Sequence, residues 1–245
     1  MKKGVILAGG MGTRLRPITR QINKHLVPIL NKPMVMYPLE TLKHLGVTDI
    51  MIVSGGGHIG GFADFFGDGS EFGVSLTYRA QKEAGGIAQA LFLAKDFVGS
   101  NDAVVILGDN IFENDGLQPL YNFQSGVASI YVKDVSDPHR FGVLAPDESG
   151  SGWSIEEKPV SPRTSKAVTG LYVYPPEVFD VIPQLSPSKR GELEITDVNN
   201  YFLAKNDMVI KEVGGFWGDA GTPESLYRAI KYVAEKEGLD PLTSK

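Results

Sequence analysis

Several apolar runs in this chain are continuous rather than alternating, and this pattern constrains the fold more than any other feature. A strand with one face in water alternates apolar and polar side chains, whereas a strand covered on both faces is apolar throughout. Six segments, most of them rich in β-branched residues, are therefore predicted as buried strands. They are residues 5–8, 49–54, 74–78, 103–107, 128–132 and 169–174.

Helical patterns separate these strands. They cover residues 34–45, 87–97 and 194–204, and a last helix begins after residue 222. Thr222 can cap the last helix, and Pro223 suits its first turn. Leu226, Ile230 and Val233 lie on one side of it. The alternation of strands and helices indicates an α/β fold with a largely parallel sheet between helices.

The middle of the chain, from about residue 134 to 166, is denser in Pro, Ser, Asp and Gly than its surroundings. These residues favour turns over long helices or strands. We expect turns and short strands in this segment, forming a lobe over the edge of the sheet before the sheet resumes.

The composition excludes several functional classes. The net charge of −5 argues against binding to nucleic acid or to a membrane surface, because both need a positive field. The chain has no cysteine, which excludes disulfides, thiolate metal sites and cysteine nucleophiles and fits a reducing compartment. No apolar run approaches the length of a membrane span, so we expect a cytoplasmic protein.

The first predicted strand runs into a glycine-rich loop with two arginines, LAGGMGTRLRP at residues 7–17. Glycine lets a backbone approach a ligand closely, and arginine commonly binds phosphate. The Walker A pattern is absent, and the dinucleotide pattern fails because Leu15 occupies its last glycine position. The backbone amides of this loop could still hold a triphosphate, with Arg14 and Arg16 beside it.

A second glycine run, at residues 55–60, does match GxGxxG and directly follows a predicted strand. Arg79, after the next strand, could meet the 2′-phosphate of NADP. An NADP-dependent reductase therefore stays open as an alternative, against a glycine-rich turn that binds nothing.

Two acids follow glycine at the ends of apolar segments, Asp109 in VVILGDNIF and Asp219 in FWGDAGT. At the carboxyl edge of the sheet, Asp109 could bind Mg²⁺ or could cap a turn. Two loop carboxylates beside a triphosphate are what one Mg²⁺ needs. Lys24 by itself is weak evidence for a binding site, because a lone lysine is usually a surface group.

Two charged segments could belong to a functional site, but each also has a purely structural explanation. Glu157 and Lys158 face opposite ways on a regular strand unless a bulge or turn redirects one of them, and a solvated edge strand is the alternative. Residues 190–197 are interpreted mostly as a charged helix start. The histidines show no metal spacing and no serine lies in a nucleophile elbow, which argues against zinc and hydrolase-triad chemistry.

Taken in order, the chain resembles the sugar-phosphate nucleotidylyltransferases, in particular the members that use dTTP and glucose 1-phosphate. The resemblance is nearly end to end. It rests on LAGGMGTRLRPIT, NKHLVPILNKPM, AGGIAQAL, LGDNIF, EEKP, AVTGLYVY, GELEITDVN and WGDAGT. It implies a Rossmann-like three-layer α/β/α fold with a mixed, mostly parallel sheet. It also implies that dTTP and glucose 1-phosphate give dTDP-glucose and pyrophosphate, for deoxysugar synthesis of the dTDP-rhamnose type.

The resemblance further implies roles for individual residues. Nucleotide contacts are expected from Leu7, Ala8, Gly9, Gly10, Gly12, Thr13, Arg14, Gln81, Gly86 and Asp109. Sugar-phosphate contacts are expected from Gly142, Glu157, Lys158 and Val168. Arg14, more than Arg16, would bind the departing pyrophosphate, and Lys24 and Lys158 would be the other catalytic cations. Asp109 and Asp219 would hold the cofactor Mg²⁺.

The same resemblance implies one domain over residues 1–245, with a nucleotide half at 1–133, a sugar-phosphate half at 134–222, and a helix and tail at 223–245. The reaction needs no general base, because the attacking phosphate oxygen is already ionised at neutral pH. Longer members have C-terminal helices that help to build a regulatory nucleotide site and a subunit interface. We expect a homo-oligomer in which feedback at that second site is weak or absent.

Three alternatives stay open at this stage besides the reductase. One methyl group separates thymine from uracil, so uridylyl transfer fits nearly as well. Glucose and N-acetylglucosamine phosphates would share most contacts with the protein. A non-catalytic nucleotide-sugar sensor could use the same fold, although retention of both acids and three cations argues against it.

Overall fold

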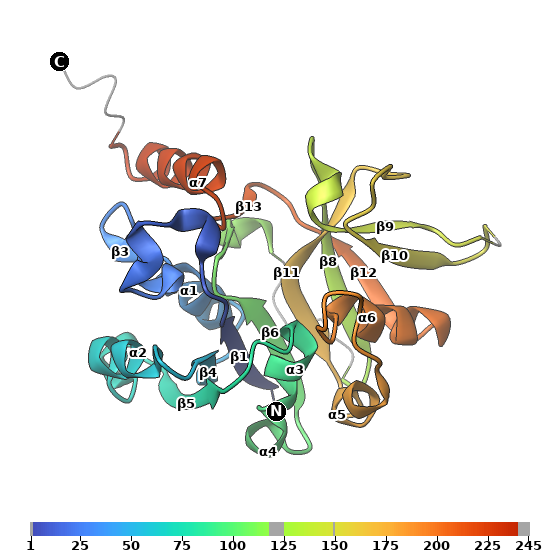
Figure 1. Cartoon of the computed structure of the whole chain (residues 1–245), viewed down its shortest axis with the longest axis horizontal. Helices are drawn as coiled ribbons and strands as arrows, with labels where there is room; N and C mark the ends of the chain where they lie inside the picture. The colour runs from blue at the N-terminus through green and yellow to red at the C-terminus, as the bar shows by residue number, and fades with distance from the viewer. Residues whose placement is uncertain (1, 118–124, 149, 240–245) are drawn as a thin grey trace.

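The computed structural model describes residues 2–117, 125–148 and 150–239, so the end of the expected C-terminal tail lies outside the described residues. Within them the main sheet has nine strands, in the order β10-β9-β11-β6-β1-β4-β5, with β8 paired to β11 and β12 to β8 (Figure 1). These strands are β1 (Lys2–Ala8), β4 (Asp49–Gly55), β5 (Ser75–Gln81), β6 (Asp102–Leu107), β8 (Ala128–Asp134), β9 (Gly142–Pro146), β10 (Trp153–Glu157), β11 (Lys166–Tyr174) and β12 (Met208–Glu212).

Smaller elements complete the described chain. Two short pairs of strands are β2 (Pro28–Ile29) with β3 (Lys32–Pro33), and β7 (Asn110–Phe112) with β13 (Trp217–Asp219). The helices are α1 (Met36–His44), α2 (Ile59–Phe66), α3 (Ile87–Phe92), α4 (Lys95–Val98), α5 (Val178–Val181), α6 (Ile195–Ala204) and α7 (Pro223–Lys236). Among the described residues, none of the helices combines the length and the apolar character needed to cross a membrane.

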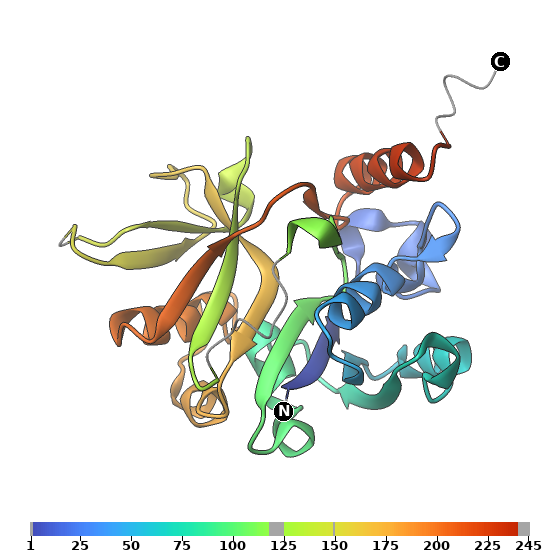
Figure 2. The same cartoon turned by 180° about the vertical axis from the view of Figure 1, so that it is seen from behind.

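Alternate residues of the central strands enter two different cores, which explains why these strands are apolar throughout. Val5 and Leu7 of β1 belong to the core shared with α3, α5 and α6. Ile6 and Ala8 belong to the core shared with α1 and α2. Figure 1 shows α3 and α6 in front of the sheet, and Figure 2 shows α1 on the opposite face. The predicted three-layer α/β/α fold is confirmed.

The sheet is mixed, as expected. β1 pairs in parallel with both β4 and β6, and β4 pairs in parallel with β5. β11 runs antiparallel to β6 and to β8. The predicted short strands of the middle segment are β9 and β10, but this hairpin does not form a lobe over the sheet edge. Ala167 of β11 pairs with Val143 of β9, so the hairpin extends the sheet itself (Figure 1).

All six predicted strands are present. Two predicted helices differ from the structure, since one is divided in two and the other begins later. The helix expected over 87–97 is divided between α3 and α4, because the Ala94 amide donates to the Leu91 carbonyl three residues back, at 2.9 Å. Such bonding tightens the chain into a turn. The helix expected from residue 34 begins at Met36, because the Met34 carbonyl accepts in a three-residue turn from the Tyr37 amide at 3.2 Å, and the Val35 carbonyl is the first to accept from four residues on, from the Leu39 amide at 3.3 Å.

The last helix begins as expected. The side chain of Thr222 accepts from the Ser225 amide at 3.2 Å, and the Ser225 hydroxyl accepts from the Thr222 amide at 3.0 Å. Val233 is buried in a core with Ile111 of β7, and Leu226 and Ile230 pack against that core. This contact anchors α7 beside β13, the strand that ends at Asp219.

We expect Thr222→Ala to lower the free energy of unfolding by about 1 kcal/mol, because the Ser225 amide loses its cap. Urea unfolding followed by circular dichroism measures the change. Thr222→Ser keeps the hydroxyl and is the control, with a loss well below that of the alanine variant. Equal losses in the two variants would contradict the capping role.

Candidate active site

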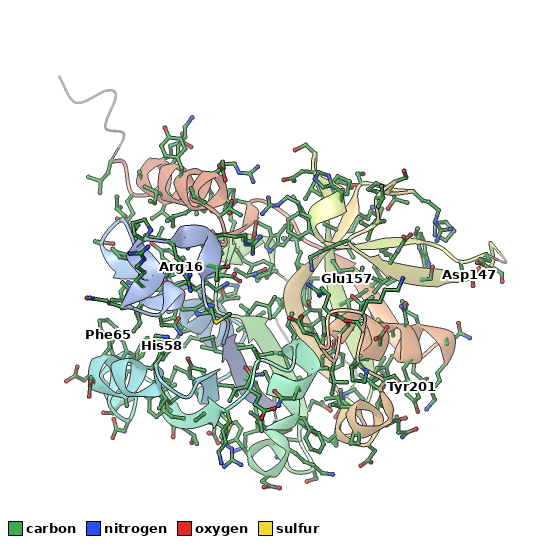
Figure 3. The ribbon with its side chains drawn as sticks, viewed as in Figure 1. Arg16, His58, Phe65, Asp147, Glu157 and Tyr201 are labelled. Carbon is green, nitrogen blue, oxygen red and sulfur yellow. The ribbon has the colours of Figure 1, made fainter. Side chains whose placement is uncertain are left out.

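A cavity of about 350 Å³ opens at the carboxyl ends of β1 and β6. Parallel α/β sheets bind ligands at this edge. Most predicted site residues line it: Leu7, Gly9, Gly10, Arg14, Lys24, Gln81, Gly86, Asp109, Gly142, Glu157, Lys158, Val168 and Asp219. Figure 3 shows Glu157 near α6, while Arg16 lies on the loop across from it. Arg14 faces the cavity and Arg16 does not.

Three predicted nucleotide contacts, Ala8, Gly12 and Thr13, are not among the residues that line the cavity. Ala8 is fully buried in the core with α1 and α2. The Gly12 carbonyl accepts from the Thr19 hydroxyl at 2.6 Å, and Thr13 begins a 3-10 turn that ends at Leu15. The part of the loop that lines the cavity is Gly9, Gly10 and Arg14.

Asp109 lies at one end of the cavity and is paired with Lys24 at 2.5 Å, with both side chains mostly buried. Burial acts to raise the pKa of Asp109, but the charge of Lys24 and its hydrogen bond, with help from His25 and Asn110, hold that pKa well below the usual range. Asp109 is therefore ionised at neutral pH, and Lys24 is a buried cation rather than a surface lysine.

Asp219 reaches the same end of the cavity because β13 pairs with β7, which places Asp219 opposite Asn110. One guanidinium nitrogen of Arg140 donates to both Asp219 oxygens, at 3.1 and 2.9 Å. Burial and the charge of Asp109 raise the pKa of Asp219, while Arg140 and Arg14 oppose that rise. The two acids are thus close enough to sense each other's charge.

Gly221 lies beside the space between the two acids. A Cβ added to Gly221 would lie 3.2 Å from Asp219 Oδ2, 3.4 Å from Asp109 Oδ2 and 3.1 Å from an Arg14 guanidinium nitrogen. Two carboxylate oxygens therefore converge on a point that glycine leaves open. Within residues 2–117, 125–148 and 150–239, no group of three or more acidic, histidine or cysteine side chains could hold a metal. Two carboxylates completed by substrate phosphates do fit Mg²⁺.

His25 lines the cavity beside these groups, and its ring is neutral at neutral pH. Burial and the neighbouring Lys24 charge lower its pKa to about 3. Its Nδ1 lies 2.7 Å from the Asn23 side-chain oxygen, which also accepts from the His25 backbone amide at 2.8 Å. Since that oxygen only accepts, the Nδ1 of the neutral ring carries the proton. Its role here is structural.

Glu157 and Lys158 both line the opposite end of the cavity, so a turn does redirect one of them. Lys158 follows the last residue of β10 and has φ +47°, in the left-handed region, where its amide donates to the Phe141 carbonyl at 3.0 Å. The Lys158 ammonium donates to Glu157 Oε1, and the Thr196 hydroxyl donates to Glu157 Oε2 at 2.7 Å. These hydrogen bonds outweigh burial and lower the pKa of Glu157.

The structure adds two arginines that sequence reasoning missed, Arg140 and Arg190. The sequence does not single out Arg140, and residues 190–197 are interpreted from the sequence mostly as a charged helix start. Arg190 and Glu194 in fact line the cavity, and Arg190 donates to Glu194 through Nε at 3.1 Å and through a terminal nitrogen at 2.8 Å. An arginine on a loop adds nothing to the periodicity of a helix or strand. Only the GELEITDVN motif of the resemblance, which directly follows Arg190, could have indicated that arginine.

Gln81 and Gly86 also line the cavity. Gln81 is the last residue of β5 and is 7% exposed. Gly86 precedes α3 with φ +96°, and a Cβ there would lie 2.5 Å from the Leu193 carbonyl oxygen. No other residue fits at this position without moving the loop before α6.

The second glycine run lies outside the cavity. None of residues 55–60 lines it, and the Gly56 amide donates to the Gln81 carbonyl at 3.1 Å. These glycines therefore close the turn between β4 and α2 against the end of β5. The geometry favours the glycine-rich turn over the reductase alternative.

Comparisons with known proteins agree with this arrangement. The family model described as nucleotidyl transferase matches residues 3–236. A glucose-1-phosphate thymidylyltransferase of Neisseria meningitidis is 40% identical over 245 residues, covering 98% of this chain and 85% of the relative. One from Mycobacterium tuberculosis is 40% identical over 239 residues, covering 96% and 83%.

Solved structures are similar as well. A crystal structure from Bacillus anthracis, named as a candidate glucose-1-phosphate thymidylyltransferase in complex with a sucrose, has a TM-score of 0.86 and 48% identity and covers 95% of both chains. A UDP-glucose pyrophosphorylase complexed with UDP-glucose has a TM-score of 0.81 at 24% identity, over 96% of this chain and 99% of that chain, which shows the shared fold alone. This chain belongs to the nucleotidyl transferase family.

Proposed function

We propose that this protein transfers a deoxythymidylyl group from dTTP to glucose 1-phosphate, giving dTDP-glucose and pyrophosphate. One observation carries the proposal. A single cavity is lined by two charged groups, the acid pair Asp109 and Asp219 with Arg14 and Lys24, and Glu157 with Lys158. This arrangement suits two phosphorylated substrates held end to end, and it agrees with the names of the relatives that match along the chain.

In the proposed reaction, an oxygen of the sugar phosphate attacks the α-phosphorus of dTTP. A new bond forms between that oxygen and the α-phosphorus, and the bond from the α-phosphorus to the oxygen bridging the β-phosphorus breaks. Pyrophosphate leaves with the electron pair. Catalysis consists mainly of positioning and charge neutralisation, because two polyanions must meet. The neutral, buried His25 is in keeping with a reaction that needs no base.

Each cation has a proposed task. Arg14 binds the departing pyrophosphate and Lys24 lies beside the reacting phosphates, since both flank the acid pair. Lys158 binds the sugar phosphate. Arg190, which is held by a hydrogen bond to Glu194, is the second cation proposed to bind this phosphate. The remaining roles follow the resemblance: Gln81 and Gly86 on the base, and Gly142, Glu157 and Val168 on the hexose.

Asp109 and Asp219 would hold Mg²⁺, whose charge stabilises the negative charge of the phosphates when it is bound. In keeping with the sequence expectations, we propose that residues 1–133 mainly bind the nucleotide and residues 134–222 mainly the sugar phosphate. We propose in addition that the protein works in the cytoplasm as a homo-oligomer, without nucleic acid or membrane partners.

Pyrophosphate release tests the proposal directly. The protein is assayed with Mg²⁺ across dTTP, UTP and other nucleoside triphosphates, each with glucose 1-phosphate, N-acetylglucosamine 1-phosphate and related sugar phosphates. We expect dTTP with glucose 1-phosphate to give the highest kcat/KM. Higher activity with UTP would replace the proposal by uridylyl transfer, and no release with any pair would exclude transferase activity. Asp109→Asn is the inactive control.

Lys158→Ala should raise the KM for glucose 1-phosphate by about tenfold or more, because a charged hydrogen bond to the sugar phosphate is lost. The KM for dTTP should change little. Lys166→Ala is the matched control, since Lys166 pairs with Glu212 at 2.6 Å on the surface and does not line the cavity. If both variants behaved alike in steady-state kinetics, the role of Lys158 would be wrong.

Gly221→Ala should weaken metal binding by about tenfold, the effect usual for a change next to metal ligands, because the new methyl group enters the space between the two acids. Mn²⁺ binding in the presence of dTTP, followed by electron paramagnetic resonance without sugar phosphate, measures this separately from turnover.

The control for this variant is Gly60→Ala, on α2, where an added Cβ meets no atom within 4 Å. We expect Mn²⁺ binding to be unchanged in the control. Unchanged binding in Gly221→Ala would show that the metal lies elsewhere.

A further inference from the structure

The side-chain amide of Gln81 is held in one orientation by two oxygen atoms. Its Nε2 donates to Gln89 Oε1 at 2.5 Å and to the Gly86 backbone oxygen at 3.4 Å. A backbone carbonyl can only accept, so the nitrogen rather than the oxygen of Gln81 must face Gly86. Gln89 then presents its own oxygen to the second N–H of the same nitrogen. Both donors of the Gln81 amide are therefore used within the protein.

The oxygen of this amide faces the other way, toward the cavity. Gln81 Oε1 lies 2.8 Å from the point where a Cβ would project from Gly9, and both residues line the cavity. In the described part of the chain, this oxygen accepts no hydrogen bond from another residue. Gln81 thus offers a ligand one acceptor and no donor.

An almost buried acceptor of this kind selects among bases by their hydrogen-bonding pattern. Thymine and uracil carry an N–H donor at N3, which Oε1 can accept. Cytosine has a ring of the same size but a lone pair at N3, so a lone pair would face Oε1. A site built around one hydrogen bond rejects an analogue that cannot make it, because the site's polar group is left unpaired.

Gln89 itself lies outside the cavity, because it is not among the residues that line it. It lies on α3, three residues after Gly86, and packs against Gly85: its Cδ lies 2.9 Å from the point where a Cβ of Gly85 would be. The absence of a side chain at residue 85 leaves the space that Gln89 fills. Gln89 can therefore contact Gln81 but not a ligand in the cavity.

We propose that Gln89 is a positioning residue that sets the choice between pyrimidines, favouring thymine or uracil over cytosine by fixing the Gln81 amide. The inference rests on the proposed nucleotidyl transfer and deepens it. Gln89 touches neither substrate, and it acts by determining which atom of Gln81 faces the base.

The experiment compares kcat/KM for dTTP and dCTP, at saturating glucose 1-phosphate and Mg²⁺, in the wild type and two variants. Gln89→Met keeps the length of the side chain beside Gly85 but removes the acceptor. The dTTP to dCTP ratio should fall about fivefold to tenfold, as expected for the loss of one orienting hydrogen bond. Gln89→Glu keeps an acceptor and should retain the wild-type ratio. The KM for glucose 1-phosphate should be unchanged in both.

Calorimetric binding of dTDP and dCDP without sugar phosphate provides a second readout that does not depend on turnover. The preference for dTDP should fall in Gln89→Met by the same factor as the kinetic ratio. Gln89→Leu removes the same acceptor with a different shape and serves if Gln89→Met folds poorly.

The outcomes separate the two proposals. An unchanged dTTP to dCTP ratio in the variants that lack the acceptor would overturn the role of Gln89 while leaving nucleotidyl transfer intact. Equal loss in Gln89→Glu and Gln89→Met would also overturn it, because packing rather than orientation would then explain the effect. No pyrophosphate release by the wild type would instead contradict the proposed function.

Discussion

The burial of two carboxylates at one edge of the sheet is the constraint on which the rest of the site depends. A buried charge is strongly unfavourable unless it is paired and hydrogen-bonded. Asp109 is paired with Lys24 and Asp219 with Arg140. Each cation comes from a segment far from its acid in the sequence. Pairing the acids therefore also fixes the loop after β1 and the turn before β9.

These pairs are suited to exchange partners with substrates. A nucleoside triphosphate brings negative charge that Arg14 and Lys24 can bind, while the acids are left to a divalent cation. Glu157 and Lys158 form a pair as well. In the proposed function this pair would separate in the same way, with the ammonium on a sugar phosphate and the carboxylate on sugar hydroxyls. In the proposed function, the site would bind charged substrates by redistributing charge that is already paired rather than by burying new unpaired charge.

The strands and the glycine loop were predictable because their signals are local. Continuous apolar runs follow from cover on both faces, and the distribution of Val5, Ile6 and Leu7 between two cores confirms that reason. The hairpin of β9 and β10 was placed wrongly, because its pairing partner in β11 is not encoded in its own pattern. Arg140 was missed for a related reason: its partner Asp219 lies 79 positions further along the chain.

The sequence by itself determined the α/β class, the strand segments, the two glycine-flanked acids and, through its ordered motifs, the family. Tertiary structure alone decided which side chains meet. The left-handed φ of Lys158 turns it into the cavity beside Glu157, and one backbone torsion is not specified by residue type. The pairing of β13 with β7 brings Asp219 to Asp109, and Gln89 fixes Gln81 across eight residues of chain. Such contacts depend on how distant segments pack, whereas periodicity reports only which residues are buried.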